Sequence, residues 1–210
     1  MNNSSESKIS PHFWLRRLHS LSGVFPIGVF LMEHMLSNSM ILKGPEAYNG
    51  VIATLSGLPY VIWIELLFIY LPILFHAFSG FFVMFTGKNN LVWYPYPANW
   101  LYVLQRISGI LTFAYVFYHF YHTRGVNLLY GTEVSYARMV ALMKVPFNFW
   151  FYIVGLAAVM FHFANGLWGF FISWGLTVGP KSQKVSGAVC AAVGVALFVL
   201  GVNSLVHLIR

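Results

Sequence analysis

Four histidines, His34, His76, His119 and His162, are the residues best suited to do chemistry in this chain. Each lies within a different long apolar stretch. An imidazole in hydrocarbon is costly to place, and ionisable groups inside membrane segments usually have a function. Neutral imidazole suits metals of intermediate softness, iron among them. The four residues therefore indicate metal binding rather than packing alone.

The composition indicates that lipid surrounds these histidines. Of the 210 residues, 59% are hydrophobic and 8% are charged, whereas about a quarter of a soluble domain is charged. The formal charge of +7 does not indicate a nucleic-acid partner, because the basic residues lie at the ends of apolar segments. The single cysteine, Cys190, lies in an apolar run, which excludes disulfides and thiolate metal sites. We therefore expect an integral membrane protein.

Five apolar segments are each long enough to cross a bilayer, which takes about 20 helical residues. We expect one all-α, membrane-embedded domain over residues 1–210, whose spans cover residues 21–42, 59–85, 100–122, 146–176 and 186–208. Pro26 lies early enough in the first span to be tolerated with a bend. Lys43-Gly-Pro45 breaks the chain after the first span, and a loop of polar to mixed composition is expected to follow it. Residues 86–99, rich in Asn, Tyr and Pro, predict a second loop, and residues 133–144 predict a short surface helix.

Depth along the helices sorts the four histidines into two pairs. At ~1.5 Å per residue from the expected cytoplasmic side, His76 and His162 lie ~15 and ~18 Å deep. By the same count, His34 and His119 lie ~21 and ~27 Å deep. Two imidazoles at one depth on facing helices suit the axial positions of a haem iron, whereas zinc prefers a closed tetrahedral set. We expect two b-type haems between the first four spans, the inner one on His76 and His162 and the outer one on His34 and His119.

A second candidate for the third ligand is His122, which lies one turn beyond His119. The pair Ser22-Gly23 precedes His34, and Ser108-Gly109 precedes His119 by a similar interval. This echo and the depth count both favour His119.

A repeated Phe-His-x-x-polar-Gly pattern surrounds the two inner histidines. Gly80 and Gly166 lie one turn past His76 and His162, on nearly the same helix face. A flat porphyrin against a helix needs such a notch, so both glycines are expected to pack against the inner haem. The alternative is that they are ordinary small residues at membrane helix contacts.

Four residues near the expected cytoplasmic side are candidates for contacting the propionates of the inner haem: Arg17, His19, Ser20 and Arg106. Arginine forms strong, charge-assisted hydrogen bonds with carboxylates. Interfacial anchoring is the alternative role for both arginines.

The basic residues favour a cytoplasmic N-terminus. In that orientation the cytoplasmic side holds Lys8, Arg16, Arg17, Lys88, Arg106, Lys181 and Lys184, and the other side holds Lys43, Arg124, Arg138, Lys144 and Arg210. Lysine and arginine concentrate on the cytoplasmic side of membrane proteins. Five spans then place the C-terminus outside the cell membrane.

Several stretches along nearly the whole chain carry a family resemblance: residues 16–20 (Arg-Arg-Leu-His-Ser), the segment around His34, and residues 75–77, 88–90, 99–109, 161–168, 174–177 and 180–183. In these stretches the chain resembles the single-polypeptide, di-haem cytochrome b anchors of succinate dehydrogenase and quinol:fumarate reductase. The resemblance implies haem ligation by the four histidines in the pairing above. It also implies a flavoprotein and an iron–sulfur subunit on the cytoplasmic face, which carry the succinate/fumarate chemistry. This chain would pass electrons between the iron–sulfur clusters and a membrane quinone, menaquinone in particular.

Two departures from that family concern protons. Some members carry a glutamate two residues before the fourth ligand, where this chain has Met160, so proton compensation by that route is not expected. The family's quinone site uses a carboxylate near the start of the second span, where this chain has Ser56 with no acid beside it. Glu33, next to His34, and Glu65 are therefore the candidate proton donors to a quinone. For either carboxyl, pairing with a neighbouring group is the alternative.

Other functions stay open on the sequence alone. A cytochrome b anchor of a hydrogenase or formate dehydrogenase would also use bis-His haems, although one histidine in each of four consecutive spans favours the first interpretation. A small transporter needs broken helices or polar faces, and the spans contain few acids. A haem-free scaffold predicts that the histidines are dispensable. The working direction, succinate oxidation or fumarate reduction, depends on the quinone and on other subunits.

Overall fold

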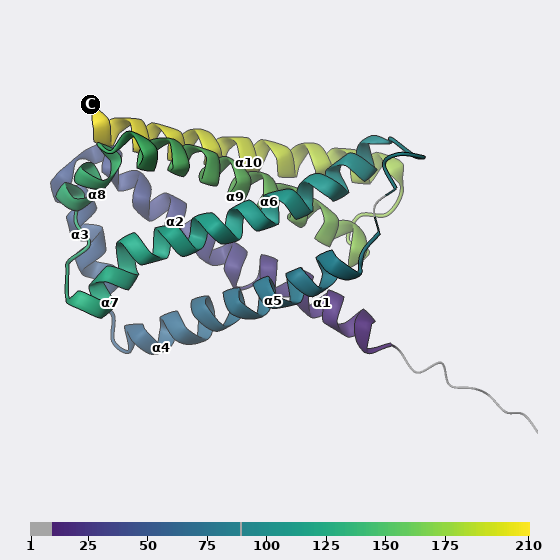
Figure 1. Cartoon of the computed structure of the whole chain (residues 1–210), viewed down its shortest axis with the longest axis horizontal. Helices are drawn as coiled ribbons and strands as arrows, with labels where there is room; N and C mark the ends of the chain where they lie inside the picture. Colours follow the sequence, from purple (N-terminus) through teal and green to yellow (C-terminus); the bar gives the residue numbers. More distant parts are fainter. Residues whose placement is uncertain (1–9, 89) are drawn as a thin grey trace, which may run out of the picture.

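The described chain is a bundle of helices. A computed structural model describes residues 10–88 and 90–210, so Lys8 and Asn89 lie outside the described residues. No strand occurs in these two ranges. Five helical stretches are long and apolar enough to cross a membrane and lie along the long axis of Figure 1: His12–Lys43, Val61–Thr86, Pro97–Tyr130, Pro146–Ser173 and Pro180–Ile209. The predicted all-α class with five membrane spans is therefore confirmed.

The first span is broken by proline, as expected. It consists of α1 (Pro11–Val24), α2 (Ile27–Asn38) and a 3₁₀ turn (Ser39–Lys43). Between α1 and α2 the backbone of Phe25 is extended, with φ −135° and ψ 124°, because Pro26 disfavours a helical residue before it. The helix begins well before the predicted residue 21, since the Ser10 hydroxyl accepts the His12 N–H at 3.3 Å and caps α1.

Two shorter helices close one end of the bundle. α8 (Tyr136–Met143) confirms the surface helix predicted within residues 133–144, whereas α3 (Pro45–Ser56) occupies a segment predicted as a loop. Pro45 stands in the first turn of α3, where its missing N–H costs no hydrogen bond. The Tyr136 N–H donates to Asn49 Oδ1 at 2.9 Å and joins the two helices. We call this end of the bundle the α3/α8 end, and the opposite end the α1 end.

The second and third spans each contain a π-helical segment. The second consists of α4 (Val61–Glu65), a π segment (Leu66–Tyr70) and α5 (Leu71–Thr86). The third consists of α6 (Pro97–Phe120), a π segment (Tyr121–Gly125) and α7 (Val126–Tyr130), so it runs past the predicted end at residue 122. Single π turns inside helices are frequent at functional sites.

α9 (Pro146–Ser173) is the central helix. It packs against α10 (Pro180–Ile209), α6, α1 and α8. The buried apolar core lies around α9 and α10 and reaches the α3/α8 end: Met35, Ile41, Tyr48, Met139, Met143, Tyr152, Leu156, Val159, Met160, Leu197, Leu205 and Leu208. α10 starts before the predicted residue 186, because Pro180 is favoured in a first helical turn.

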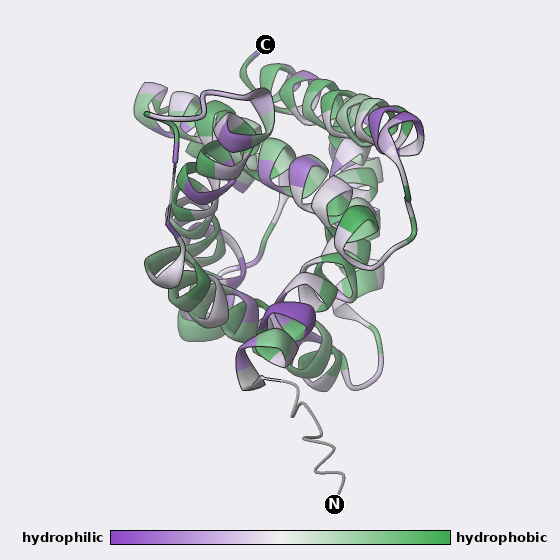
Figure 2. Cartoon of the chain, turned by 90° about the vertical axis from the view of Figure 1, so that its right-hand side faces the viewer, coloured by the Kyte–Doolittle hydropathy of each residue, from purple (hydrophilic) through white to green (hydrophobic). Residues whose placement is uncertain are grey.

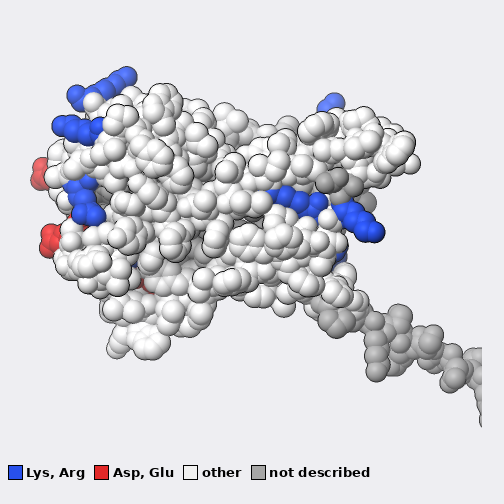
Figure 3. Space-filling view, in the orientation of Figure 1, with Lys and Arg blue, Asp and Glu red and all other residues white. Residues whose placement is uncertain are grey.

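The surface is that of a membrane protein. Large apolar side chains are widely exposed along the spans, for example Phe78 at 67% and Phe117 at 69%, and Figure 2 shows apolar residues on every side of the bundle. On the face shown in Figure 3, Lys and Arg lie towards both ends, whereas the acidic side chains, all Glu, lie only towards the α3/α8 end. The start of α1 and the C-terminus lie at opposite ends (Figure 1).

Candidate functional site

His76 on α5 and His162 on α9 face each other. Their ring centres are 6.2 Å apart and the ring planes are at 87°. The depth count from the sequence had assigned these two residues to one level. The structure therefore brings together the pair expected at the inner haem.

Each inner histidine is held by a carbonyl and a serine of a neighbouring helix. His76 Nδ1 lies 3.0 Å from the His19 carbonyl oxygen and 3.2 Å from Ser22 Oγ on α1. His162 Nδ1 lies 3.0 Å from the Gln105 carbonyl oxygen and 3.3 Å from Ser108 Oγ on α6. Because a carbonyl can only accept, each Nδ1 carries the hydrogen and donates it. Nε2 then keeps its lone pair, which is the tautomer that a metal requires.

Two glycines allow this close contact. A Cβ added at Gly23 would lie 2.5 Å from His76 Cε1, and one added at Gly109 would lie 3.0 Å from His162 Cε1. From the sequence, the Ser22-Gly23 and Ser108-Gly109 pairs were connected only with His34 and His119. The structure shows that they contact the inner histidines, a role that sequence reasoning missed. The available signal was depth, since both pairs lie at the level of His76 and His162.

His34 on α2 and His119 on α6 form the second pair. Their ring centres are 5.6 Å apart and the planes are at 80°. Polar neighbours differ from those of the inner pair: Asn38 Nδ2 lies 3.3 Å from His34 Nδ1, and the Tyr152 hydroxyl lies 3.3 Å from His119 Nδ1. His122 instead packs on the Tyr118 ring at 4.1 Å. The structure thus brings His119, rather than His122, against His34.

His19 lies beside the inner pair. Its ring stacks on His76 with centres 4.1 Å apart and planes at 14°, and its Nδ1 lies 3.0 Å from Ser79 Oγ. A Cβ at Gly80 would lie 3.1 Å from His19 Cε1, and one at Gly166 would lie 3.1 Å from Gln105 Nε2. Both glycines therefore permit the close approach of side chains from α1 and α6.

The other candidates for propionate contacts lie at the α1 end. Arg17 donates to the Ser173 carbonyl, and its guanidinium lies 5.2 Å from the centre of the Trp174 ring. The Trp174 indole N–H donates to Ser20 Oγ at 3.0 Å. Arg106 instead contacts Tyr102 on its own helix, 3.7 Å from the ring centre. Arg17 and Ser20 thus belong to one junction between α1 and the end of α9.

The two candidate carboxyls differ in their surroundings. Glu65 Oε2 accepts from Arg124 Nη2 at 2.9 Å and from the Tyr70 hydroxyl at 3.3 Å. This ion pair connects the second span to the third, where each has its π segment. Glu33 is exposed on α2. Met160, which replaces the family's glutamate, is buried in α9 with 2% exposure.

Five apolar helices and two pairs of histidines from four of them define a class of protein, a helical membrane subunit built around paired imidazoles. A profile of the family described as Succinate dehydrogenase/Fumarate reductase transmembrane subunit matches residues 87–201. The Succinate dehydrogenase cytochrome b558 subunit of Bacillus subtilis (strain 168) is 42% identical over 193 residues, which cover 92% of this chain and 95% of that relative. The chain belongs to the succinate dehydrogenase/fumarate reductase transmembrane-subunit family.

Proposed function

We propose that the chain is the membrane anchor and electron-transfer subunit of a succinate:quinone oxidoreductase. Electrons pass through two bis-His b haems between an iron–sulfur subunit and a membrane quinone, menaquinone in particular. The observation that carries the proposal is the pairing of His76 with His162 and of His34 with His119. The relative whose printed name is a succinate dehydrogenase cytochrome b558 subunit supports it.

The donor set fits haem better than a bare metal ion. In residues 10–88 and 90–210, no group of three or more His, Cys, Asp or Glu side chains is arranged to hold a metal. A pair of imidazoles supplies only two ligands, and two axial ligands are what haem iron needs from a protein. Two imidazoles that bind one metal atom at ~2 Å per metal–nitrogen bond would have ring centres up to roughly 6 Å apart. The observed separations are 6.2 and 5.6 Å.

The chain's own residues orient the ligands. Bound haem supplies one-electron redox chemistry. The carbonyls of His19 and Gln105 hold the inner imidazoles in one tautomer, and the two serine hydroxyls set the rotation of the rings. Such outer-shell hydrogen bonds commonly raise the basicity of a ligating imidazole.

The partners and orientation follow the family resemblance. A flavoprotein subunit and an iron–sulfur subunit bind the cytoplasmic face, with the N-terminus cytoplasmic and the C-terminus outside the cell membrane. The start of α1 and the end of α10 lie at opposite ends of the bundle, as five spans require (Figure 1). The modest excess of Lys and Arg that the sequence assigns to the α1 side supports a cytoplasmic N-terminus.

A reduced-minus-oxidised spectrum of the purified full chain, with its co-purifying polypeptides identified, tests the proposal. We expect b-type α bands from two haems per chain and two soluble partner subunits. His76→Ala should remove the inner haem and leave the outer one, whereas the matched control His122→Ala should keep both. A folded, colourless preparation would refute the haem proposal. Co-purification with hydrogenase or formate dehydrogenase subunits would support the alternative complex.

The quinone end is tested separately. A quinone takes up protons with electrons, so a donor carboxyl is needed near the outer pair. We expect quinone reductase activity to fall in Glu65→Gln or Glu33→Gln, while both haems keep their spectra. If both variants keep full activity, neither carboxyl is the donor.

A further inference from the structure

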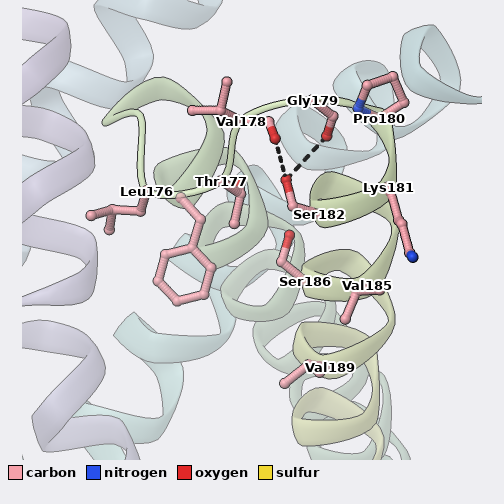
Figure 4. Close-up of a pocket in the computed structure, with 11 residues that line it drawn as sticks. Leu176, Thr177, Val178, Gly179, Pro180, Lys181, Ser182, Val185, Ser186 and Val189 are labelled. Carbon is pink, nitrogen blue, oxygen red and sulfur yellow. Dashed lines mark hydrogen bonds between the residues drawn. The ribbon is translucent and has the colours of Figure 1, made fainter.

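An open groove lies between the end of α9 and the start of α10, at the α1 end of the bundle. Its volume is about 800 Å³, and it is lined by residues of both helices and of the segment between them: Phe171, Leu176, Thr177, Val178, Gly179, Pro180, Lys181, Ser182, Val185, Ser186 and Val189. Figure 4 shows Val185 and Val189 in succession along α10, with Leu176 and Thr177 across from them. The groove is separate from both histidine pairs, and none of the lining residues has a role in the proposed electron transfer.

The lining changes from polar to apolar along the helix. At the mouth, Lys181 lines the groove, and Lys184 is exposed one turn along the same helix. Further along α10, Val185 and Val189 are exposed at 57% and 56%. From Pro180 to Val189 the helix rises roughly 13 Å, whereas the headgroup layer of a bilayer is only roughly 5–8 Å thick on each side. The groove therefore extends from the headgroup level into the hydrocarbon.

The mouth of the groove favours an anion. The N-cap residue of α10 is Gly179, which has no side chain, so the first amides of the helix lack a side-chain acceptor. The Ser182 hydroxyl does not serve them, because it donates to the carbonyls of Val178 and Gly179 (Figure 4). In addition, the buried Thr177 Oγ1 has no hydrogen-bond partner among the described residues. On the face shown in Figure 3, no acidic side chain lies at the α1 end to neutralise the lysines.

The groove is already formed by contacts between the two helices. The Trp168 indole N–H on α9 donates to the Gln183 carbonyl on α10 at 2.8 Å. This bond fixes the first turn of α10 against α9, so a ligand can bind in the groove without first having to bring the two helices together.

From the charge of the mouth and the apolar length below it, we propose that this groove binds one anionic phospholipid. Its phosphate lies against Lys181 and the first turn of α10, and one acyl chain follows Val185 and Val189. A zwitterionic lipid lacks the net negative charge that matches the two lysines, and free phosphate does not use the apolar length.

The test uses the full chain, purified in mild detergent with its co-purifying subunits and stripped of lipid. Phosphatidylglycerol or phosphatidylcholine is added, and bound lipid is counted by native mass spectrometry. We expect one phosphatidylglycerol to be retained in preference to phosphatidylcholine. Each basic residue near an anionic lipid contributes enough to change binding about fivefold, so Lys181→Gln with Lys184→Gln should weaken it roughly 25-fold. Lys43→Gln, at the α3/α8 end, is the matched control.

A second variant tests the apolar part of the groove. Val185→Trp should abolish lipid retention with both lysines intact, whereas Val199→Trp, at a similarly exposed position further along α10, should not. The haem spectrum of every variant reports folding. Retention of phosphatidylglycerol by Val185→Trp would overturn the proposal. So would displacement of the lipid by inorganic phosphate, equal binding of phosphatidylcholine, or shielding of Lys181 by a partner subunit in the lipid-free complex.

Discussion

A graded pair of glycine substitutions would test whether α1 and α6 set the position of the inner ligands. In Gly23→Ala the new Cβ would lie 2.5 Å from His76 Cε1, so the ring must retreat by about 0.9 Å to reach the 3.4 Å of ordinary contact. In Gly109→Ala the distance to His162 Cε1 is 3.0 Å, and a retreat of about 0.4 Å suffices. Gly169→Ala, on the same bundle, meets nothing within 4 Å.

The three variants share one effect and differ in another. Each replaces a helical glycine by alanine, which favours the helix by about 1 kcal/mol. Only the first two displace an imidazole, and disturbing the surroundings of a metal ligand typically costs 10–100-fold in affinity. We therefore expect loss of inner-haem affinity near the top of this range for Gly23→Ala, near the bottom for Gly109→Ala, and none for Gly169→Ala.

The assay is the haem-to-protein ratio with a reduced-minus-oxidised spectrum, in which the outer haem is an internal reference. The content of inner haem should be lowest in Gly23→Ala, higher in Gly109→Ala and unchanged in Gly169→Ala, while the content of outer haem stays the same in all three. The reasoning is refuted if Gly23→Ala keeps as much inner haem as Gly169→Ala. It is also refuted if the outer haem is lost instead, since no part of His34 or His119 is among the close contacts of Gly23.

Three further predictions concern separate groups. Ser22→Ala or Ser108→Ala should keep both haems but shift the midpoint potential of the inner one alone, because each removes one hydroxyl beside an Nδ1; an equal shift in the outer haem contradicts this. Arg124→Gln should lower stability by about 1–2 kcal/mol, since Glu65 then keeps only the Tyr70 hydroxyl as a partner. Thermal unfolding should show that adding Glu65→Gln recovers most of the loss, and no recovery would contradict the pairing. Burial raises the pKa of the Tyr48 phenol from about 10 to about 12. The folded protein therefore binds this proton more tightly than the unfolded chain, and the stability that results is lost as the pH rises from 10 through 12. Tyr48→Phe should reduce this loss of melting temperature at alkaline pH, and an unchanged pH profile would contradict the prediction.

The sequence predicted the parts of the molecule that follow from regular helix geometry. A nearly constant rise per residue carries depth information along a span, so counting alone matched His76 with His162 and His34 with His119, and the break at Pro26 was too small to change the pairing. The spans themselves were visible because their composition differs sharply from that of the loops. The short surface helix predicted within residues 133–144 is α8.

The parts that were missed depend on local exceptions and on side-chain direction. The composition of α3 is mixed, with polar residues and a glycine among the apolar ones, so no strong pattern separated it from a loop. The third span continues past His122 because a π turn carries the helix through residues that look like a loop. The contact of Ser22 with His76 could not be read from spacing within one helix, since it depends on how α1 and α5 are rotated against each other.

The two π segments have a consequence for side-chain direction. In an α-helix, residues five apart point about 140° away from each other, so Tyr70 could not reach Glu65. The π segment at Leu66–Tyr70 widens one turn, and the Tyr70 hydroxyl donates to Glu65 at 3.3 Å. A π turn amounts to one inserted residue within a helix. One extra residue in each of the second and third spans therefore changes the direction in which the Glu65 and Arg124 side chains point. The rest of each span, which carries the histidine, keeps its alignment with its neighbours, so a one-residue insertion can add a polar pair without moving the ligands.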